Sequence, residues 1–221
     1  LQLDVADDAS MVNAVEEIIN SEGKIDVLIN NAGFGSYGAI EEVPLAKARY
    51  QMEVNVFGLA RMAQLVLPQM RKQHSGKIVN ISSIGGKFAP PFGGWYYASK
   101  FAVEALSDSM RVEVKQFGIN VIVIEPGLVK SEWNDIAMDS ALKVTKNKTY
   151  KKMVDKMIGM NHRFLTRNTE PEVIAGLIYK AITAKHPRTR YHGGFMAGMT
   201  LFLRKILTDK QIDMVIASRL K

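Results

Sequence analysis

Two adjacent tyrosines and a lysine occur in the stretch GGWYYASKFAVEAL. Tyr96 precedes Lys100 by four residues, so on a helix the two side chains lie on one face, one turn apart. Tyr97 is only three residues from Lys100 and points about 100° away from Tyr96 around the helix. A phenol with a pKa of about 10 is a poor acid–base group at neutral pH unless a neighbouring cation lowers that pKa. We expect Lys100 to lower the pKa of Tyr96, although this spacing alone arises by chance in many helices.

Two serines, Ser82 and Ser83, end the apolar stretch GKIVNISS. Side chains at the carboxyl end of a parallel strand reach the crevice where such sheets bind ligands. Ser83 lies thirteen residues before Tyr96, and a connection of that length can fold back over the crevice. The competing interpretation is that both hydroxyls only satisfy backbone groups of a loop or helix end.

The tetrapeptide Asn30-Asn31-Ala32-Gly33 and the isolated Asn55 are further candidates. The tetrapeptide is also typical of a turn that ends a strand. Asn55 is a polar residue inside an apolar helical stripe, and a buried asparagine needs hydrogen-bond partners. We expect it to bridge a helix backbone and an active-site water.

Apolar runs that alternate with helical runs must position these residues. Strands are expected within residues 25–33, 76–83 and 118–127. Their continuous apolar character favours a parallel sheet covered on both faces. Helices are expected at 10–21, at 45–73 with a break or kink at Pro68, and at 96–116 with a buried face of Val103, Leu106, Met110 and Val114. The alternation predicts a doubly wound parallel α/β sheet, with a ligand site at the carboxyl ends of its strands.

Composition narrows the possibilities further. The 221 residues are 47% hydrophobic and 23% charged, which is typical of a single globular domain. No cysteine is present, which excludes disulfides and thiolate metal sites, and the four histidines lack metal-ligand spacing. The net charge of +7 favours a lysine-rich surface over nucleic-acid binding, because no nucleic-acid motif is present.

No membrane span is expected, and we predict a cytoplasmic protein. The apolar run 195–203 is too short to cross a bilayer, and packing against the domain is favoured over lying on a membrane surface.

Taken together and in order, these motifs resemble the short-chain dehydrogenase/reductase family, which has a Rossmann fold and uses NAD(P). The resemblance is specific from the first residues to about residue 131. The C-terminal part of the chain is similar to the branch of the family that contains 17β-hydroxysteroid and retinol dehydrogenases. It is carried by Asp4 in LDVAD, NNAG at Asn30–Gly33, Asn55 in EVNVFG, Ser83 in NISS, Tyr96 and Lys100 in YYASK, and PGLVKS at Pro126–Ser131.

The resemblance implies hydride transfer between a nicotinamide and a carbonyl or alcohol carbon of a hydrophobic substrate, catalysed by Asn55, Ser83, Tyr96 and Lys100. Tyr96 is expected to exchange the proton with the substrate oxygen, and Ser83 to hold that oxygen. Lys100 is expected to bind the nicotinamide ribose, and Asn55 to fix a water in a proton relay. The cofactor contacts expected besides Tyr96 and Lys100 are Asp4, Asn30, Ala32, Gly33, Pro126, Gly127, Val129 and Ser131.

One departure from the family concerns the start of the chain. In the family's pattern, a glycine-rich phosphate turn precedes the LDVAD motif by some fifty residues. The sequence contains no such turn. We therefore expect a Rossmann domain over residues 1–221 that lacks its first two strands and belongs to a longer protein. The lost segment carries the residues that select between NADP and NAD, and NADP is slightly preferred.

Residues 131–165 and 187–221 are expected to form a substrate loop or lid and a C-terminal extension. The methionines and lysines of 141–164 are more typical of a core helix than of a lid. The resemblance also implies a homodimer or homotetramer formed through helices 45–73 and 96–116. Two other functions stay open: an epimerase or dehydratase that shares Tyr-x-x-x-Lys, and a non-catalytic dinucleotide sensor.

Overall fold

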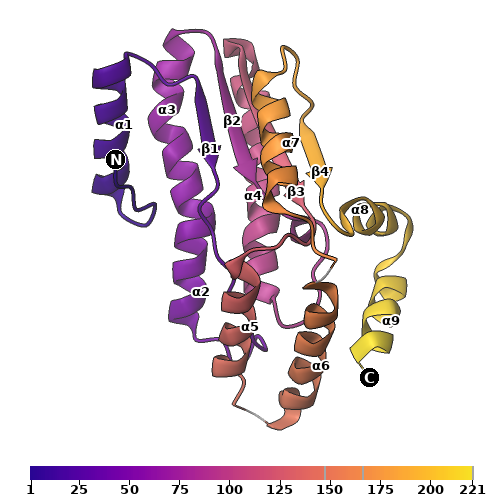
Figure 1. Ribbon diagram of the computed structural model, residues 1–221. Coiled ribbons are helices and arrows are strands. Elements are labelled where there is room, and N and C mark those ends of the chain that lie inside the picture. The colour runs from indigo at the N-terminus through magenta and orange to yellow at the C-terminus, as the bar shows by residue number, and fades with distance from the viewer. Residues whose placement is uncertain (147, 166, 221) are drawn as a thin grey trace.

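A parallel sheet forms the centre of the protein (Figure 1). The computed structural model describes residues 1–146, 148–165 and 167–220. The strands lie in the order β1-β2-β3-β4, and all three pairings are parallel. They are β1 (Val27–Asn30), β2 (Gly76–Ile81), β3 (Ile119–Pro126) and β4 (Arg190–Gly193). The first three fall within the runs predicted from the sequence.

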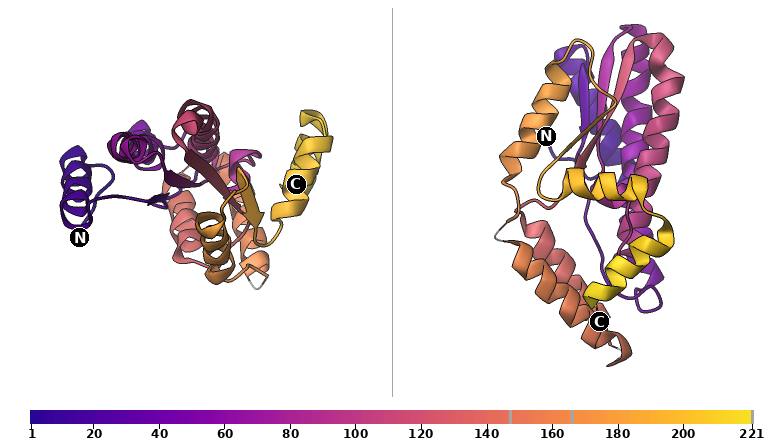
Figure 2. Two further views of the ribbon diagram at one scale, coloured as in Figure 1. Left: turned by 90° about the horizontal axis from the view of Figure 1, so that it is seen from above. Right: turned by 90° about the vertical axis from the view of Figure 1, so that its right-hand side faces the viewer.

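Helices cover both faces of this sheet. Figure 2 shows α3 and α4 on one face and α7 on the other, so the predicted doubly wound α/β architecture is confirmed. The helices are α1 (Asp8–Glu22), α2 (Leu45–Met52), α3 (Leu59–Lys72), α4 (Gly94–Val114), α5 (Glu132–Val144), α6 (Lys148–Leu165), α7 (Pro171–Thr183), α8 (Ala197–Ile206) and α9 (Asp209–Leu220). None of the described helices combines the length and the hydropathy needed to cross a bilayer.

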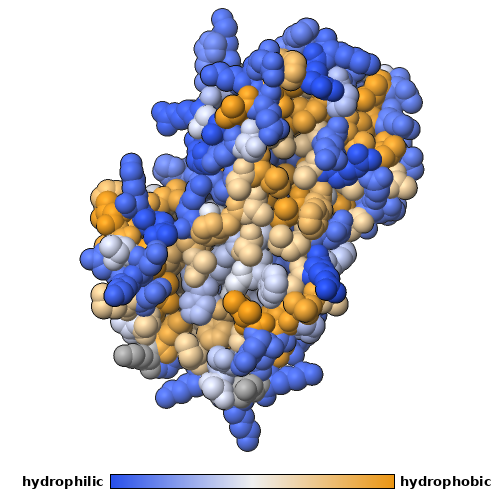
Figure 3. Space-filling model, turned by 180° about the vertical axis from the view of Figure 1, so that it is seen from behind, coloured by the Kyte–Doolittle hydropathy of each residue, from blue (hydrophilic) through white to orange (hydrophobic). Residues whose placement is uncertain are grey.

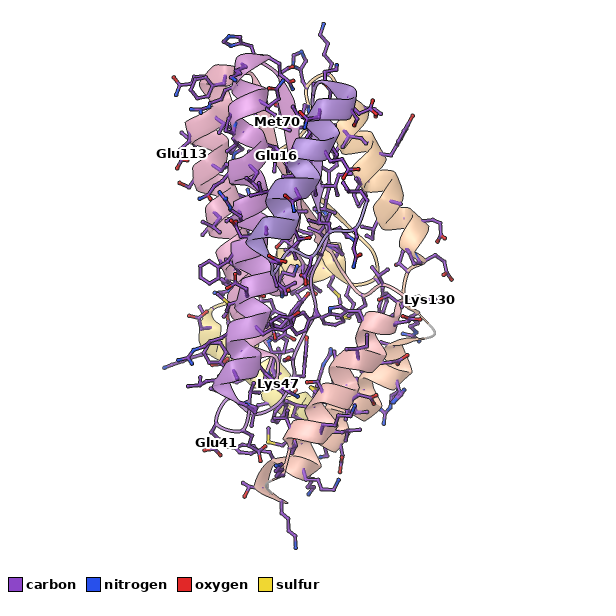
Figure 4. The ribbon with its side chains drawn as sticks, turned by 90° about the vertical axis from the view of Figure 1, so that its left-hand side faces the viewer. Glu16, Glu41, Lys47, Met70, Glu113 and Lys130 are labelled. Carbon is purple, nitrogen blue, oxygen red and sulfur yellow. The ribbon has the colours of Figure 1, made fainter. Side chains whose placement is uncertain are left out.

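Apolar side chains fill the space on either side of β2 and β3. Ile78 points toward α1 and α3, where Met70 belongs to the same buried cluster, whereas Val79 packs with Ile122 toward α7. Figure 4 shows Met70 within the helical layer and Glu16 of α1 near it in this view. Burial on both faces explains why these strands are apolar throughout. Each fully buried side chain of this kind contributes about 1.5–3 kcal/mol to folding.

The long helix expected at 45–73 is continuous but irregular at an unexpected place. Pro68 lies inside α3, which continues to Lys72, so of the predicted break or kink the break is wrong. The irregularity is instead a π-helical turn, Glu53–Gly58, between α2 and α3. Such turns are frequent at functional sites, and this one contains Asn55.

The outer edge of β1 is open. Residues 1–4 precede α1 without forming a strand. Among the described residues, β1 has a hydrogen-bonded neighbour only on the β2 side, and Ile29 in its middle is 41% exposed. Within the described residues, the sheet therefore ends at β1.

Candidate active site

A cavity of about 820 Å³ opens where β1, β2 and β3 end. It is lined by eight of the predicted site residues: Gly33, Ser83, Tyr96, Lys100, Pro126, Gly127, Val129 and Ser131. Asp4, Asn30, Ala32 and Asn55 are not among its lining residues. The carboxyl edge of the sheet thus brings most of the predicted residues together, as expected for doubly wound folds.

Ser83 and Tyr96 form the polar centre of this cavity. Ser83 caps the short 3₁₀ turn Ile84–Gly86, where its Oγ accepts a hydrogen bond of 3.0 Å from the Gly85 N–H. Tyr96 lies in the first turn of α4 and is buried. Burial raises the pKa of Tyr96 to about 12, and a side-chain hydrogen bond with Ser83 lowers it in part. The two hydroxyls therefore lie within reach of one bound oxygen atom.

Lys100 follows Tyr96 one turn along α4 and is also buried. Its ammonium donates a 2.8 Å hydrogen bond to the Ile81 carbonyl and lies 5.9 Å from the centroid of the Tyr96 ring. Burial lowers the pKa of Lys100 to about 8, against the opposing effect of the Glu104 carboxylate. The expected lowering of the Tyr96 pKa by Lys100 is not found in the protein alone, where desolvation dominates and Ser83 provides the opposing effect.

Asn55 braces the site from the π-helical turn. Its Oδ1 accepts from the Phe34 N–H at 3.0 Å, and its Nδ2 donates to the Phe34 carbonyl at 2.9 Å and to Ser99 Oγ at 3.0 Å. Ser99 in turn donates to the Tyr96 carbonyl at 2.6 Å. Asn55 therefore ties the loop after β1 to the helix that carries Tyr96, a role that the expected water relay did not include.

Gly33 packs against both Asn55 and Lys100. A β-carbon on Gly33 would lie 3.2 Å from Asn55 Oδ1 and 3.7 Å from Lys100 Nζ. A larger residue would crowd these two atoms, so glycine keeps the backbone of the turn close to them.

Asn30 lies beneath the cavity instead of lining it. Its Nδ2 donates to Asn80 Oδ1 at 2.9 Å, and Asn80 donates to Ser107 Oγ at 2.9 Å. The chain of bonds joins β1, β2 and α4. Sequence reasoning did not assign Asn80, although an asparagine inside an apolar strand was a visible signal.

The two remaining predicted residues lie apart from this centre. Asp4 is exposed near the chain start and accepts a hydrogen bond from the Ala6 N–H at 2.8 Å. Ala32 is exposed beside Gly33. Their predicted contacts with the adenine end and the cofactor stay predictions.

The loop after β3 closes the other side of the cavity. The Gly127 N–H donates to the Gly193 carbonyl at 2.8 Å, and a β-carbon on Gly127 would overlap the Phe195 carbonyl. Ser131 is the N-cap residue of α5, yet its hydroxyl makes no capping hydrogen bond. That hydroxyl lines the cavity and is available to a ligand.

Three aromatic residues, Tyr37, Tyr97 and Trp133, surround Tyr96, and the sequence did not identify Tyr37 or Trp133 as part of the site. The Trp133 ring lies 4.9 Å and the Tyr37 ring 6.0 Å from the Tyr96 ring, measured between centroids. The Tyr37 hydroxyl donates to the Tyr97 hydroxyl at 3.2 Å. Burial raises the pKa of Tyr37 and of Tyr97, so both stay protonated near neutral pH. These rings give the cavity an apolar wall.

A cluster of charges around the buried Glu104 supports α4 behind Lys100. Glu104 is 4% exposed, and its Oε2 lies 2.9 Å from both Lys87 Nζ and Arg190 Nη2. Arg190 also reaches Asp108 at 2.6 Å. These ion pairs join α4 to β4 and to the loop after Ser83.

The fold and this site together define a doubly wound α/β protein with a serine, a tyrosine and a lysine at the ligand crevice. A family model described as short chain dehydrogenase matches residues 1–140. The chain is 38% identical over 190 residues to a 3-ketodihydrosphingosine reductase of Bacteroides thetaiotaomicron, covering 86% of this chain and 70% of the relative. Human 17-beta-hydroxysteroid dehydrogenase type 1 is 34% identical over 194 residues, covering 86% of this chain and 58% of that protein.

Solved structures agree with these sequence matches. A short-chain dehydrogenase from Streptomyces avermitilis superimposes with a TM-score of 0.75 at 30% identity, covering 99% of this chain and 75% of that one. The chain therefore belongs to the short-chain dehydrogenases, a family of oxidoreductases.

Proposed function

We propose that the protein transfers a hydride between NADP(H) or NAD(H) and a carbonyl or alcohol carbon of a hydrophobic substrate. The observation that carries this proposal is the pair of hydroxyls of Ser83 and Tyr96, which interact with each other in a largely apolar cavity. Two hydroxyls that converge on one point can bind a carbonyl oxygen, and one of them can exchange a proton with it.

Tyr96 is the proposed acid in reduction and base in oxidation. With a pKa of about 12 it is protonated at neutral pH, so in reduction it can donate its proton to the substrate oxygen. Ser83 holds the same oxygen by a hydrogen bond. The Lys100 ammonium, with a pKa of about 8, is mostly charged at pH 7 and favours the tyrosinate when Tyr96 has lost its proton.

The residues around the cavity fit a nicotinamide cofactor. Gly33 offers backbone without a side chain, and the uncommitted Ser131 hydroxyl and the Lys100 ammonium offer polar contacts. We propose that Gly33, Lys100, Val129 and Ser131 hold the nicotinamide half, and that the adenine half extends toward Asp4. When bound, the nicotinamide supplies or accepts the hydride. The proposed cofactor is NADP or NAD, with NADP slightly preferred.

The cavity wall favours an apolar substrate. Besides the aromatic residues, it contains Phe88, Leu128, Ile174, Ile178 and Met196. Trp133 comes from the proposed lid 131–165 and Met196 from the proposed extension 187–221, so both segments can contribute to substrate selection. A relative named for 3-ketodihydrosphingosine, a ketone on a long alkyl chain, supports a hydrophobic ketone.

An assay of NADPH and NADH oxidation with long-chain, steroid and short polar ketones tests this function. Tyr96→Phe should lower turnover by about 10²–10⁴-fold, because it removes only the acid–base hydroxyl. Tyr97→Phe is the matched control, since it removes a neighbouring buried hydroxyl and should keep activity. Equal losses in both variants would contradict the role of Tyr96.

The same assay distinguishes the proposed dehydrogenase from the two alternative functions, an epimerase or dehydratase and a dinucleotide sensor. Turnover of substrate without net oxidation of the dinucleotide would identify an epimerase or dehydratase. Dinucleotide binding without any turnover across the ketone panel would identify a sensor.

We also propose a homodimer or a dimer of dimers formed through helices 45–73 and 96–116. Apolar side chains gather on the face that α3 and α4 present (Figure 3). Exposed apolar residues of helices 45–73 and 96–116 include Tyr50, Phe57, Phe101, Leu106 and Val112. Phe101→Glu should yield a monomer in sedimentation velocity, whereas Phe202→Glu on α8 should not. A wild-type protein that sediments only as a monomer at micromolar concentration would refute the interface.

A cytoplasmic location is part of this proposal, because the reaction draws on the reduced nicotinamide pool. Fractionation of cells that produce the protein tests it.

A further inference from the structure

Helix α6 presents a row of cations to solvent. Its inner face packs against the aromatic cluster of the active site through Val154, Met157 and Ile158. Residues spaced by four lie on one face of a helix, and this spacing separates Lys148, Lys152 and Lys156. These three residues and Arg163, here called the cationic row, line a surface cleft of about 750 Å³ together with Arg219 of α9.

The protein itself does not neutralise the cationic row. Helix α6 carries five basic residues and one acidic residue, Asp155. Asp155 and Lys151 line the same cleft and pair with each other at 3.6 Å. Within the described part of the chain, no ion pair engages the four members of the cationic row. The cleft is therefore a concentration of positive charge that an external anion can approach.

Helices α8 and α9 expose apolar side chains beside this row. Met199, Phe202 and Ile206 follow at spacings of three and four and form one exposed face of α8, with Phe202 60% exposed. Met214 of α9 is 63% exposed, and no side chain of α9 is fully buried. An exposed apolar face of this size normally marks an interaction site.

The helices that carry the cationic row and the exposed apolar side chains lie on one side of the molecule. Arg219 of α9 lines the same cleft as α6, and Phe164 at the end of α6 stacks 5.9 Å from Phe195, just before α8. The right-hand view of Figure 2 shows α8 and α9 at the front with α6 beside them. A single flat partner can contact all three helices at once.

We propose that α6, α8 and α9 dock the protein on a bilayer that contains anionic lipid. Lysine and arginine beside exposed apolar side chains match the anionic headgroups and the acyl boundary of such a surface. A second copy of the chain would bring the two cationic rows together and repel. A nucleic acid would match the charge but leave the apolar faces of α8 and α9 exposed. Docking is separate from the proposed reaction and is measured without substrate.

Sedimentation with large vesicles tests the proposal. The wild-type protein should bind vesicles of phosphatidylcholine with about one-third phosphatidylglycerol, and should bind pure phosphatidylcholine much more weakly. Raising the salt concentration should release it from the anionic vesicles, because the headgroup attraction is screened.

Two variants separate the charge contribution from the apolar one. The triple variant Lys148→Gln, Lys152→Gln, Lys156→Gln should bind anionic vesicles about 100-fold more weakly, since each lysine near the surface contributes about fivefold. The control changes the same charge elsewhere, with Lys72→Gln, Lys115→Gln and Lys180→Gln, and should bind as the wild type does. Phe202→Trp provides a fluorophore on α8, whose added emission should shift to the blue and be quenched by brominated lipid.

Three results would overturn the proposal. They are equal binding to neutral and anionic vesicles, equal binding by the two triple variants, and a residue-202 tryptophan that stays fully accessible to aqueous quencher when vesicles are present. A self-association that Phe202→Glu abolishes, without vesicle binding by the wild type, would assign the face to a second copy instead. Circular dichroism melting curves check that each variant is folded.

Discussion

The hydrogen bonds of Asn55 allow the loss of stability in Asn55→Ala to be calculated. Asn55 is 1% exposed and makes three hydrogen bonds, two to the Phe34 backbone and one to Ser99. Each bond contributes about 1 kcal/mol net, and the Phe34 groups left unpaired in Asn55→Ala add to the loss. We expect the free energy of unfolding to fall by about 4 kcal/mol.

Urea unfolding followed by circular dichroism measures this loss. With a slope of about 2 kcal/mol per molar urea, the midpoint should fall by about 2 M. Asn55→Asp keeps the side-chain volume and the acceptor for the Phe34 N–H but removes both donors, so it should also destabilise. Asn13→Ala, an exposed asparagine on α1, should shift the midpoint very little. A midpoint shift below about 0.5 M for Asn55→Ala would refute the reasoning.

Three further predictions concern buried charge and close packing. The folded pKa of Lys100 is about 8 against an ordinary 10.5, so the unfolded chain binds more protons between these values and the free energy of unfolding should rise with pH from about 8 toward 10. Lys100→Met should remove that rise in pH-dependent urea titrations. Glu104→Gln removes the carboxylate shared by Lys87 and Arg190 and should cost about 1–2 kcal/mol by urea unfolding, because both cations are partly exposed and Arg190 keeps Asp108, whereas the exposed Glu16→Gln should cost almost nothing. Gly58→Ala would overlap the Val5 carbonyl and should lower the melting temperature, whereas Gly176→Ala meets nothing within 4 Å and should raise it slightly; the opposite order would contradict the packing.

The sheet was predictable from the sequence because its strands are buried on both faces. Continuous apolar runs locate β1, β2 and β3, and Gly23 and Gly118, both with positive φ, end the helical segments where expected. Leu106 was predicted to be buried but is 37% exposed, since periodicity alone does not locate the edge of an apolar face.

The site residues that belong to short sequence motifs could be predicted. The residues that only tertiary contacts bring to the site could not. Ser83, Tyr96 and Lys100 come from two local stretches on one sheet edge. Tyr37 and Trp133 come from segments without a recognisable period, and only folding brings their rings to Tyr96. The raised pKa of Tyr96 likewise depends on burial, which the spacing of Tyr96 and Lys100 does not reveal.

The π-helical turn Glu53–Gly58 also sets a phase relation within the long helix. A π turn accommodates one residue more than an α turn, so deletion of one residue there would restore a regular helix. The helices α2 and α3 would keep their phase, because the wider π turn spreads the extra residue over nearly the same rotation as an α turn. The turn would then lack the extra residue that lets Asn55 reach the Phe34 backbone while Val66 and Met70 stay in the core. The position of Asn55 therefore depends on the number of residues in this segment as much as on which residues they are.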